Sequence, residues 1–220
     1  MTTNLFEAIL IALMPIFVLP HEPILNEPAE TVSVESIKTD EIQNIIQKMM
    51  EIARMNQVDT GEGVMVGLAA PQIGIPKRII LVDMSVTEER KNTGDLSAFI
   101  NPEIVWYSDV IEFGVEGCYS VDDHVDGSVP RSDKIIVRGY DAKGQFFERQ
   151  FSGFQARIFQ HEIDHLNGIR FPDRVGKKGD LHWIPDGKYQ EYRDNWKNWP
   201  LKCPWDIWQK MKAGEPYNYP

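Results

Sequence analysis

The chain has 220 residues, of which 42% are hydrophobic and 25% charged, and its formal net charge is -10 at pH 7. This length fits one domain with a substantial core, whereas the acidic balance argues against a general nucleic-acid-binding protein, because phosphate attraction needs a basic face. The two cysteines can form at most one intramolecular disulfide, which excludes a cysteine-rich secreted scaffold and favours a reducing, cytoplasmic location.

The chain begins with an apolar stretch at residues 5–19. No Lys or Arg precedes it, it contains Glu7 and Pro15, and it is shorter than the roughly 20 residues of a membrane span. We therefore predict no membrane segment. We expect a short helix followed by a strand that packs on the domain, with a signal peptide as the alternative. The prolines between Pro20 and Pro28 predict an extended, irregular segment after it.

An amphipathic helix is predicted next, over residues 40–56, because apolar residues recur there on one helical face. The stretch 61–74 is dominated by small residues and lacks the Gly-Lys-Ser/Thr ending of a phosphate loop, so we predict a tight turn. Alternating apolar residues then predict several strands. They cover residues 78–84, 98–106, 110–115, 134–140 and 145–151, with a turn at Gly144 joining the last two.

A longer helix follows these strands and carries a His-Glu-x-x-His motif at His161, Glu162 and His165. Since a helix advances about 100° per residue, the two histidines lie on one face, one turn apart, and can bind the same metal ion. Glu162 lies beside them, where its carboxylate can reach a water molecule on that ion. Two core histidines with backbone partners are the simpler alternative. The order of elements predicts an α+β fold, in which mostly antiparallel sheets pack around this helix.

A metal site of this kind needs a third protein ligand. One class of metallopeptidase extends the motif with a glycine and, three residues later, a third ligating histidine. Here Gly168 is present, but Phe171 occupies the position of that histidine and cannot ligate. The remaining candidates are Glu191 downstream and Cys118 upstream. Taken alone, Cys118 fits an inert, half-buried thiol. Combined with the two histidines, it completes a Cys/His/His set that keeps one tetrahedral position for water and binds zinc or ferrous iron.

Three separated motifs occur in a fixed order along the chain. They are Gly-Leu-Ala-Ala-Pro-Gln at 67–72, Glu-Gly-Cys-Tyr-Ser at 116–120 and His-Glu-Ile-Asp-His at 161–165. Together they resemble the three motifs of the peptide deformylase family. The resemblance covers roughly residues 16–173. We therefore predict a single deformylase-like domain over 1–220, with its core at about 16–173. An extension of residues 1–15 precedes that core, and a Trp-rich extension of residues 176–220 follows it.

The resemblance implies a metal-dependent hydrolase that removes the formyl group from the N-terminal formyl-methionine of nascent polypeptides and releases formate. In that family a Cys/His/His set holds the metal, which implies Cys118, His161 and His165 as the ligands here. The family's usual metal is ferrous iron, Fe(2+), with Zn(2+), Ni(2+) or Co(2+) as substitutes. The implied partners are N-formylmethionyl peptides, with the ribosome as a further candidate and no direct nucleic-acid binding.

The resemblance also implies roles around the metal. Glu162 acts as the general base, while the side-chain amide of Gln72 and the backbone N–H of Tyr119 donate to the oxyanion. These three residues form the predicted catalytic set. The predicted substrate-binding residues lie beside them. Gly67 lets an extended peptide run alongside, because it has no side chain to block the path, and a methionine pocket is built partly from Phe154 and Ile158.

The chain departs from the family pattern at several positions. Met65 stands where the family commonly has glycine, Tyr119 replaces the commoner leucine, and Asp122 occupies a position often held by proline. The acidic segment 122–128 also lacks the arginine that many members use to hold the substrate backbone. We therefore expect the reaction to be kept while peptide preference differs.

The C-terminal extension carries five of the six tryptophans. We expect these rings to pack back on the sheet, with a surface for a second copy or the ribosome as the alternative. Two other functions remain open. One is a metallopeptidase that uses Glu191 as third ligand, and the other is a peptide-binding or metal-binding relative without turnover. The sequence makes no prediction of oligomeric state.

Overall fold

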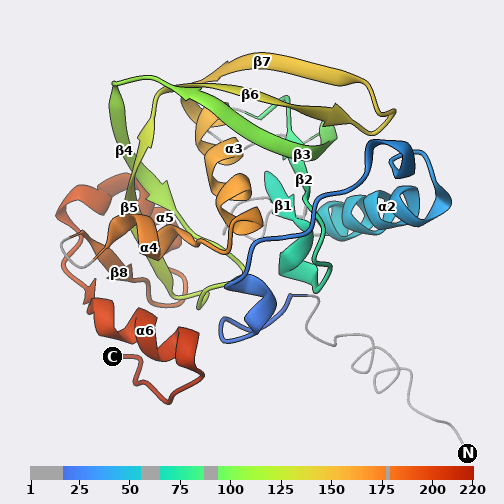
Figure 1. The fold of residues 1–220 in the computed structure, drawn as a ribbon. Coiled ribbons are helices and arrows are strands. Elements are labelled where there is room, and N and C mark those ends of the chain that lie inside the picture. Colours follow the sequence, from blue (N-terminus) through green and yellow to red (C-terminus); the bar gives the residue numbers. More distant parts are fainter. Residues whose placement is uncertain (1–16, 56–64, 87–93, 177–178) are drawn as a thin grey trace, which may run out of the picture.

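The computed structural model describes residues 17–55, 65–86, 94–176 and 179–220. Its architecture is α+β, as predicted, with two antiparallel sheets and the long helix α3 (Gly153–Leu166) between them (Figure 1). The larger sheet has the strand order β1-β2-β3-β6-β7, and the smaller has the order β4-β5-β8-β9. Helix α3 packs against β1 and β2 of the larger sheet and against β5 of the smaller one. Both sheets therefore hold the helix that carries the two motif histidines.

The larger sheet contains four of the five strands predicted from alternation. Its strands are β1 (Gly67–Ala69), β2 (Ile79–Asp83), β3 (Leu96–Tyr107), β6 (Lys134–Asp141) and β7 (Phe146–Ser152). The turn between β6 and β7 has Gly144 at a φ of 72°, as expected for this hairpin. The predicted tight turn at 61–74 is different where it is described. Residues 67–69 form β1, and the 3-10 helix η3 (Ala70–Ile73) follows.

The smaller sheet was largely missed by the sequence analysis, which predicted β4 alone. Its strands are β4 (Ile111–Glu116), β5 (Val125–Ser132), β8 (Leu181–Trp183) and β9 (Lys202–Cys203). Residues 125–128, treated as part of an acidic loop, belong to β5. This strand lacks an apolar alternation because it buries polar side chains such as Asp126 and Arg131. The partners of Arg131, Glu116 and Asp164, lie on other elements. Local pattern does not reveal such a strand.

The remaining helices cover the sheets and extend the domain. They are α2 (Asp40–Met55), α4 (Phe171–Val175), α5 (Tyr189–Asn195) and α6 (Trp205–Ala213), with 3-10 helices η1 (Pro23–Leu25), η2 (Val34–Ser36) and η4 (Trp196–Asn198). Helix α2 matches the predicted amphipathic helix and buries Ile42, Ile46 and Met49 in one cluster with Leu81 of β2. Each such side chain contributes roughly 1.5–3 kcal/mol by leaving water.

Helix α3 ends at a glycine that no other residue can replace without strain. Gly168 has a φ of 72°, and a Cβ there would lie 2.7 Å from the backbone of Asn26. The left-handed conformation ends the helix, and the close approach fastens its end to the segment that precedes α2.

The Trp-rich C-terminal extension packs back on the domain, as expected. Trp183, Trp199 and Trp208 are all at most 6% exposed. Trp208 packs in a cluster with Val125 of β5 and Phe171 of α4, and its indole N–H donates to Asp173 over 2.8 Å. Because these contacts join the extension to β5, the extension also shapes the surroundings of the pocket described below.

The apolar stretch 5–19 lies mostly outside the described residues. Its described end, residues 17–19, forms no strand, in contrast to the expectation. The N–H of Val18 donates instead to the carbonyl of Gln72 over 2.9 Å. Both cysteines are free thiols. Among the helices of the described ranges, none combines the length and apolar character that a membrane crossing requires.

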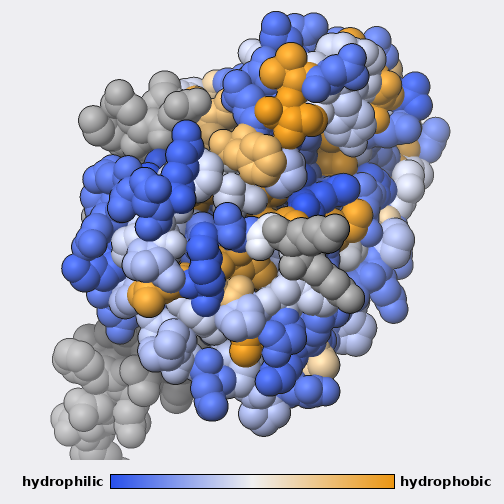
Figure 2. Space-filling model, turned by 90° about the vertical axis from the view of Figure 1, so that its left-hand side faces the viewer, coloured by the Kyte–Doolittle hydropathy of each residue, from blue (hydrophilic) through white to orange (hydrophobic). Residues whose placement is uncertain are grey.

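Large exposed apolar side chains gather where β3 ends and β4 begins. Trp106 and Tyr107 on β3, and Ile111 and Phe113 on β4, are all at least 45% exposed. Figure 2 shows one face of the molecule, on which hydrophobic residues form separate patches among hydrophilic ones. Exposed apolar side chains are normal on a protein surface, so this group alone indicates no function.

Candidate metal centre and substrate pocket

A Cys/His/His cluster forms where α3 meets the loop after β4. His161 and His165 come from α3 and Cys118 from that loop, and one potential ligand atom from each lies within 4.8 Å of the other two. The Sγ of Cys118 is 3.2 Å from Nε2 of His165. Ligands 2.0–2.3 Å from one tetrahedral ion lie roughly 3.5 Å apart, so these three donors fit a single zinc-like or iron-like ion. Glu191 is not in this cluster and instead pairs with Lys188 on α5.

Burial lowers the pKa of His161, but hydrogen bonds to Cys118 and Glu116 outweigh it and raise that pKa well above the usual range, so metal binding there releases a proton. Nδ1 of His161 lies 2.9 Å from a carboxylate oxygen of Glu116, and donating its proton there leaves Nε2 as a free lone pair. His165 is 1% exposed, and this burial is the main cause that lowers its pKa well below the usual range. A neutral imidazole is the form that ligates.

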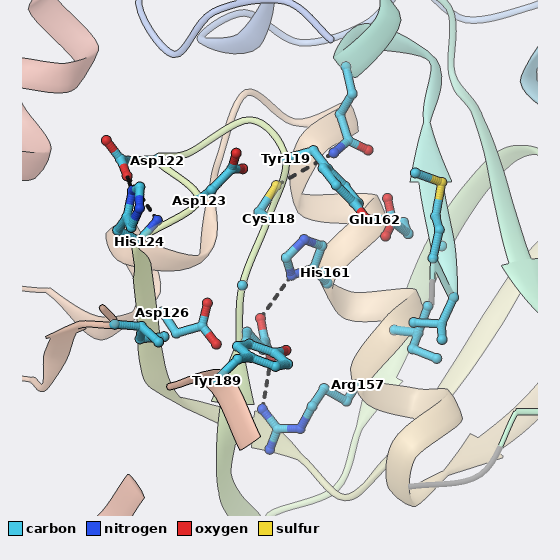
Figure 3. Close-up of a pocket in the computed structure, with 18 of the residues that line it drawn as sticks. Cys118, Tyr119, Asp122, Asp123, His124, Asp126, Arg157, His161, Glu162 and Tyr189 are labelled. Carbon is cyan, nitrogen blue, oxygen red and sulfur yellow. Dashed lines mark hydrogen bonds and ion pairs between the residues drawn. The ribbon is translucent and has the colours of Figure 1, made fainter. Parts of the chain in front are cut away.

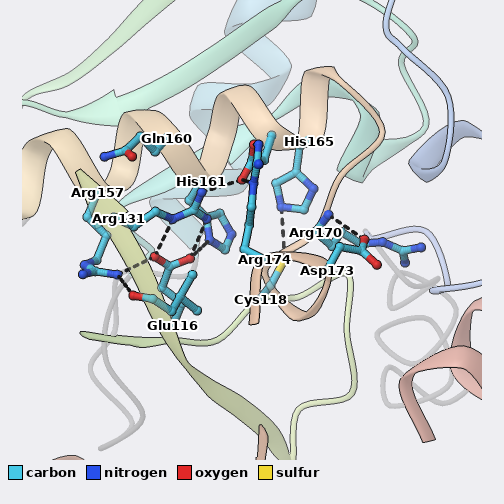
Figure 4. A network of polar contacts seen from close by, with 12 residues as sticks. Glu116, Cys118, Arg131, Arg157, Gln160, His161, His165, Arg170, Asp173 and Arg174 are labelled. Carbon is cyan, nitrogen blue, oxygen red and sulfur yellow. Dashed lines mark hydrogen bonds and ion pairs between the residues drawn. The ribbon is translucent and has the colours of Figure 1, made fainter. Parts of the chain in front are cut away.

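A buried network of charged side chains supports His161 from behind (Figure 4). Arg131 donates to both oxygens of Glu116, over 3.0 and 2.8 Å, and Arg157 donates to one of them over 2.8 Å. Burial alone raises the pKa of Glu116, but the charge and hydrogen bonds of Arg131 outweigh it and hold that pKa well below the usual range. Arg131 also donates to Asp164 of α3 over 2.5 Å. The carboxylate facing His161 is therefore permanently charged and fixed in place.

Sequence reasoning missed this network. Glu116 belongs to the second motif and Arg131 lies within the span of the resemblance, but neither was given a role. A charged residue next to glycine and cysteine in a motif was the available signal. Spacing alone does not reveal that Glu116 and Arg131 are both at most 5% exposed and paired with each other.

Glu162 lies beside the cluster on α3 with one carboxylate oxygen near β1. A Cβ built on Gly67 would come within 2.4 Å of Oε1, and Oε2 has no hydrogen-bond partner among the described residues. The side chain is 5% exposed, and burial raises its pKa to about 7. A carboxylate with unused acceptor capacity, next to a metal cluster, is placed to exchange protons with a water molecule.

Gln72 and Tyr119 both lie next to Cys118 at the pocket. Oε1 of Gln72 accepts the N–H of Ala69 over 2.7 Å, which turns its amide nitrogen toward the sulfur at 3.5 Å. Tyr119 follows Cys118 directly, and its ring stacks on Phe17 with 4.7 Å between ring centroids. The amide of Gln72 is thus oriented before any substrate arrives.

These residues line a cavity of about 360 Å³ (Figure 3). Its walls include the predicted residues Gly67, Gln72, Phe154 and Ile158, together with Met65, Cys118, Tyr119, His161 and Glu162. His165 is buried behind this surface. The C-terminal extension supplies a further wall through residues 184–187 and Tyr189, which the sequence analysis did not anticipate. Residues far apart in sequence therefore converge on one pocket, as expected of an active site.

The arrangement also matches known proteins. A family model described as polypeptide deformylase matches residues 13–180. The chain belongs to the peptide deformylase family. Members of this family are hydrolases that remove the N-terminal formyl group from nascent polypeptides. The predicted resemblance is therefore confirmed, and with it the class of enzyme to which the chain is related.

Individual deformylases show how far the likeness extends. Peptide deformylase 2 of Bacillus anthracis is 37% identical over 174 residues, which cover 76% of this chain and 91% of that protein. Peptide deformylase 1A of Arabidopsis thaliana, described as chloroplastic/mitochondrial, is 36% identical over 174 residues. That match covers 74% of this chain and 61% of the plant protein, so the chain matches less than two thirds of the longer plant relative.

Solved deformylase structures agree with the fold. The Met-Ala-Ser-bound class I type b peptide deformylase of Acinetobacter baumannii has a TM-score of 0.64 and 33% identity, covering 72% of this chain and 96% of that one. An inhibitor complex of the Plasmodium falciparum peptide deformylase has a TM-score of 0.59 and 30% identity over 81% of this chain and 94% of that one. The similarity thus spans nearly all of each solved deformylase.

Proposed function

We propose that this chain hydrolyses the formamide bond of N-formylmethionyl peptides and releases formate. The observation that carries the proposal is the convergence of Cys118, His161 and His165 on one point beside the buried Glu162, at the wall of a pocket. Membership of the deformylase family supports it. A deformylase of this fold has been solved with Met-Ala-Ser bound, which is a deformylated tripeptide sequence.

The proposed metal ligands are Cys118, His161 and His165, and the proposed ion is ferrous iron, with zinc, nickel or cobalt as substitutes. Two nitrogens and a sulfur suit these borderline ions, and three protein ligands leave a position open. A divalent cation bound there would supply Lewis-acid chemistry, lowering the pKa of a water molecule and polarising a carbonyl oxygen. Glu116 would hold the His161 ring in the correct tautomer throughout.

Glu162 is the proposed general base. Its carboxylate takes a proton from the attacking water and returns it to the amine that leaves, so that the base is regenerated in each cycle. The amide of Gln72 and the backbone N–H of Tyr119 are the proposed oxyanion donors. Donors of this kind typically contribute about 3–4 kcal/mol each to lowering the barrier.

The substrate is proposed to lie along β1. Gly67 lets the strand lie close against α3, because a Cβ there would clash with Glu162 and Ile158. An extended peptide is proposed to pair with β1 beside this residue. Phe154 and Ile158, one turn apart on α3 and both on the pocket wall, would contact the methionine side chain. Apolar contact of this kind favours methionine over polar first residues.

The direct test is formate release from formyl-Met-Ala-Ser by protein loaded with ferrous iron under anaerobic conditions. We expect turnover by the wild type, and we expect Glu162→Gln to bind the metal fully while losing at least about 100-fold in kcat. Unchanged kcat in that variant would rule out Glu162 as the base. A fully loaded wild type that releases no formate would favour a binding protein without turnover.

The alternative of a metallopeptidase is less well supported, since Glu191 pairs with Lys188 and lies outside the cluster. The same assay separates the two activities. A deformylase releases formate and leaves Met-Ala-Ser intact, whereas a peptidase cleaves between residues of the tripeptide. Mass spectrometry of the products distinguishes them.

The proposed place of action is the cytoplasm, on chains emerging from the ribosome. Two free thiols and bacterial relatives support a reducing compartment. Formyl-methionine occurs at the start of new chains, so the proposed substrate must be supplied by translation. Cosedimentation of the purified protein with ribosomes tests this association.

A further inference from the structure

The last six residues of the chain return to the metal site. Helix α6 ends at Gly214, whose φ of 68° reverses the chain direction, and residues 215–220, which we call the tail, follow it. The tail rings of Tyr217 and Tyr219 pack against Trp183 of β8, with ring centroids 6.5 and 5.2 Å apart. These contacts place the tail beside residues 118–125, which we call the cysteine loop.

The tail makes a specific polar contact with the cysteine loop. The hydroxyl of Tyr217 donates to Oδ2 of Asp122 over 2.5 Å. The other oxygen of Asp122 accepts the backbone N–H of His124 over 2.8 Å and faces the His124 ring over 3.0 Å. The ring of Tyr219 lies on His124, with 4.6 Å between ring centroids. Asp122 therefore joins the tail to the loop through one carboxylate.

The same loop holds the sulfur of the metal cluster. The N–H of Val121 donates to the carbonyl of Cys118 over 2.9 Å, and the N–H of Val125 donates to the carbonyl of Asp122 over 2.9 Å. The N–H of Ser120 points at the Cys118 sulfur over 3.3 Å. Figure 3 shows Cys118, Asp122 and His124 on one continuous segment at the pocket. Two consecutive turns therefore transmit the position of Asp122 to the sulfur.

We propose that the tail is a positioning element for the metal centre, in which Tyr217 holds the cysteine loop through Asp122 and so keeps the Cys118 sulfur in its ligating position. The inference rests on the proposed function only in taking Cys118 as a metal ligand. Tyr217 is not part of the cluster and does not itself line the pocket, so it acts through Asp122, which does line it. The loop is also anchored by the buried side chains of Val121 and Val125, so the effect of losing the tail contact is partial.

The test compares full-length wild type with Tyr217→Phe, each loaded with cobalt(II). The substitution keeps the ring against Trp183 and removes only the hydroxyl that donates to Asp122. A hydrogen bond to a charged acceptor is among the stronger ones, so we expect cobalt to be released to a chelator about tenfold faster. We also expect a weaker or shifted thiolate-to-cobalt absorption band and a lower kcat with little change in KM.

Two control variants separate positioning from general loss of stability. Tyr219→Phe removes a tail hydroxyl for which the described residues provide no hydrogen bond, and we expect it to keep the wild-type rate and spectrum. Ile46→Val in α2 destabilises the domain by roughly 0.5–1.5 kcal/mol far from the tail, a loss corresponding to about a 2- to 13-fold change in the folding equilibrium.

The outcomes separate failure of the tail's proposed role from failure of the proposed function. Wild-type release, spectrum and kcat in Tyr217→Phe would overturn the inference, as would an equal acceleration of release in Ile46→Val. If the cobalt-loaded wild type releases no formate from formyl-Met-Ala-Ser, the proposed function fails. The chelator comparison and the absorption band still test the tail in that case, because neither depends on turnover.

Discussion

The glycine at the start of β1 offers the sharpest test of how the site is built. In Gly67→Ala, the new Cβ would lie 2.4 Å from Oε1 of Glu162 and 2.9 Å from Cγ2 of Ile158. An ordinary contact begins at 3.4 Å, so the carboxylate has to move by 3.4 − 2.4 = 1.0 Å. Both neighbours lie on α3, which is packed between two sheets and cannot shift as a whole. The substitution therefore displaces the proposed base most, while the Ile158 methyl has to give by 3.4 − 2.9 = 0.5 Å.

The size of the effect follows from that displacement. Misplacing a reacting group by about 1 Å can cost about 100-fold in rate, which corresponds to about 2.7 kcal/mol of barrier. We expect kcat for formate release to fall by this factor. Metal content should stay at the wild-type level, because the ligating atoms of Cys118, His161 and His165 are not among the contacts of the new Cβ.

Formate release by the iron-loaded variant, with metal content measured in parallel, provides the assay. Gly94→Ala is the matched control, since a Cβ at that position meets nothing within 4 Å. It should behave as the wild type. If Gly67→Ala holds a full complement of metal and keeps wild-type kcat, then Glu162 either is not the base or is not confined as the structure indicates.

Two further predictions concern the buried charges. Glu116→Gln leaves Arg131 buried with one anionic partner fewer. We expect a loss of about 3 kcal/mol in the free energy of unfolding, measured by urea denaturation, and a 10- to 100-fold weaker metal affinity, measured by competition with a chelator. Wild-type values for both would show that Glu116 does not support His161. Burial raises the pKa of Asp173, but hydrogen bonds from Lys212, Trp208 and the backbone of Arg170 outweigh it and lower that pKa. The carboxylate therefore stabilises the fold above its unfolded pKa of about 3.9, and this contribution is lost as the pH falls through the lower, folded value. At pH 7, we expect the free energy of unfolding of Asp173→Asn, measured in urea, to be about 1–2 kcal/mol lower than that of the wild type, and we expect this difference to vanish below about pH 4. A difference that does not change with pH would exclude stabilisation by the Asp173 charge.

Much of the proposed metal site was predictable because its strongest signals are local. His161 and His165 are one helical turn apart, and a 3.6-residue period alone places them on one face. The strands β2, β3, β4, β6 and β7 were also predicted, since their apolar residues alternate or run continuously. The third ligand was narrowed to Cys118 and Glu191, and the resemblance of three ordered motifs selected Cys118.

Other features had no local signal. Strand β5 was missed because it buries Asp126 and Arg131 instead of alternating apolar residues. The short strand β1 was predicted as a turn, since small residues permit both and only its pairing with β2 decides between them. The C-terminal extension was expected to pack on the sheet, but its place at the pocket wall and the contact of Tyr217 with Asp122 join residues 95 positions apart.

The sequence by itself determined the proposed reacting groups of this protein, because the helical repeat and each of the three short motifs are encoded within a few consecutive residues. Tertiary structure alone decided how those groups are held. The carboxylate behind His161, the close approach at Gly67 and the tail on the cysteine loop all depend on side chains from different elements meeting in the folded chain. There, burial makes an unpaired charge costly and a paired one rigid.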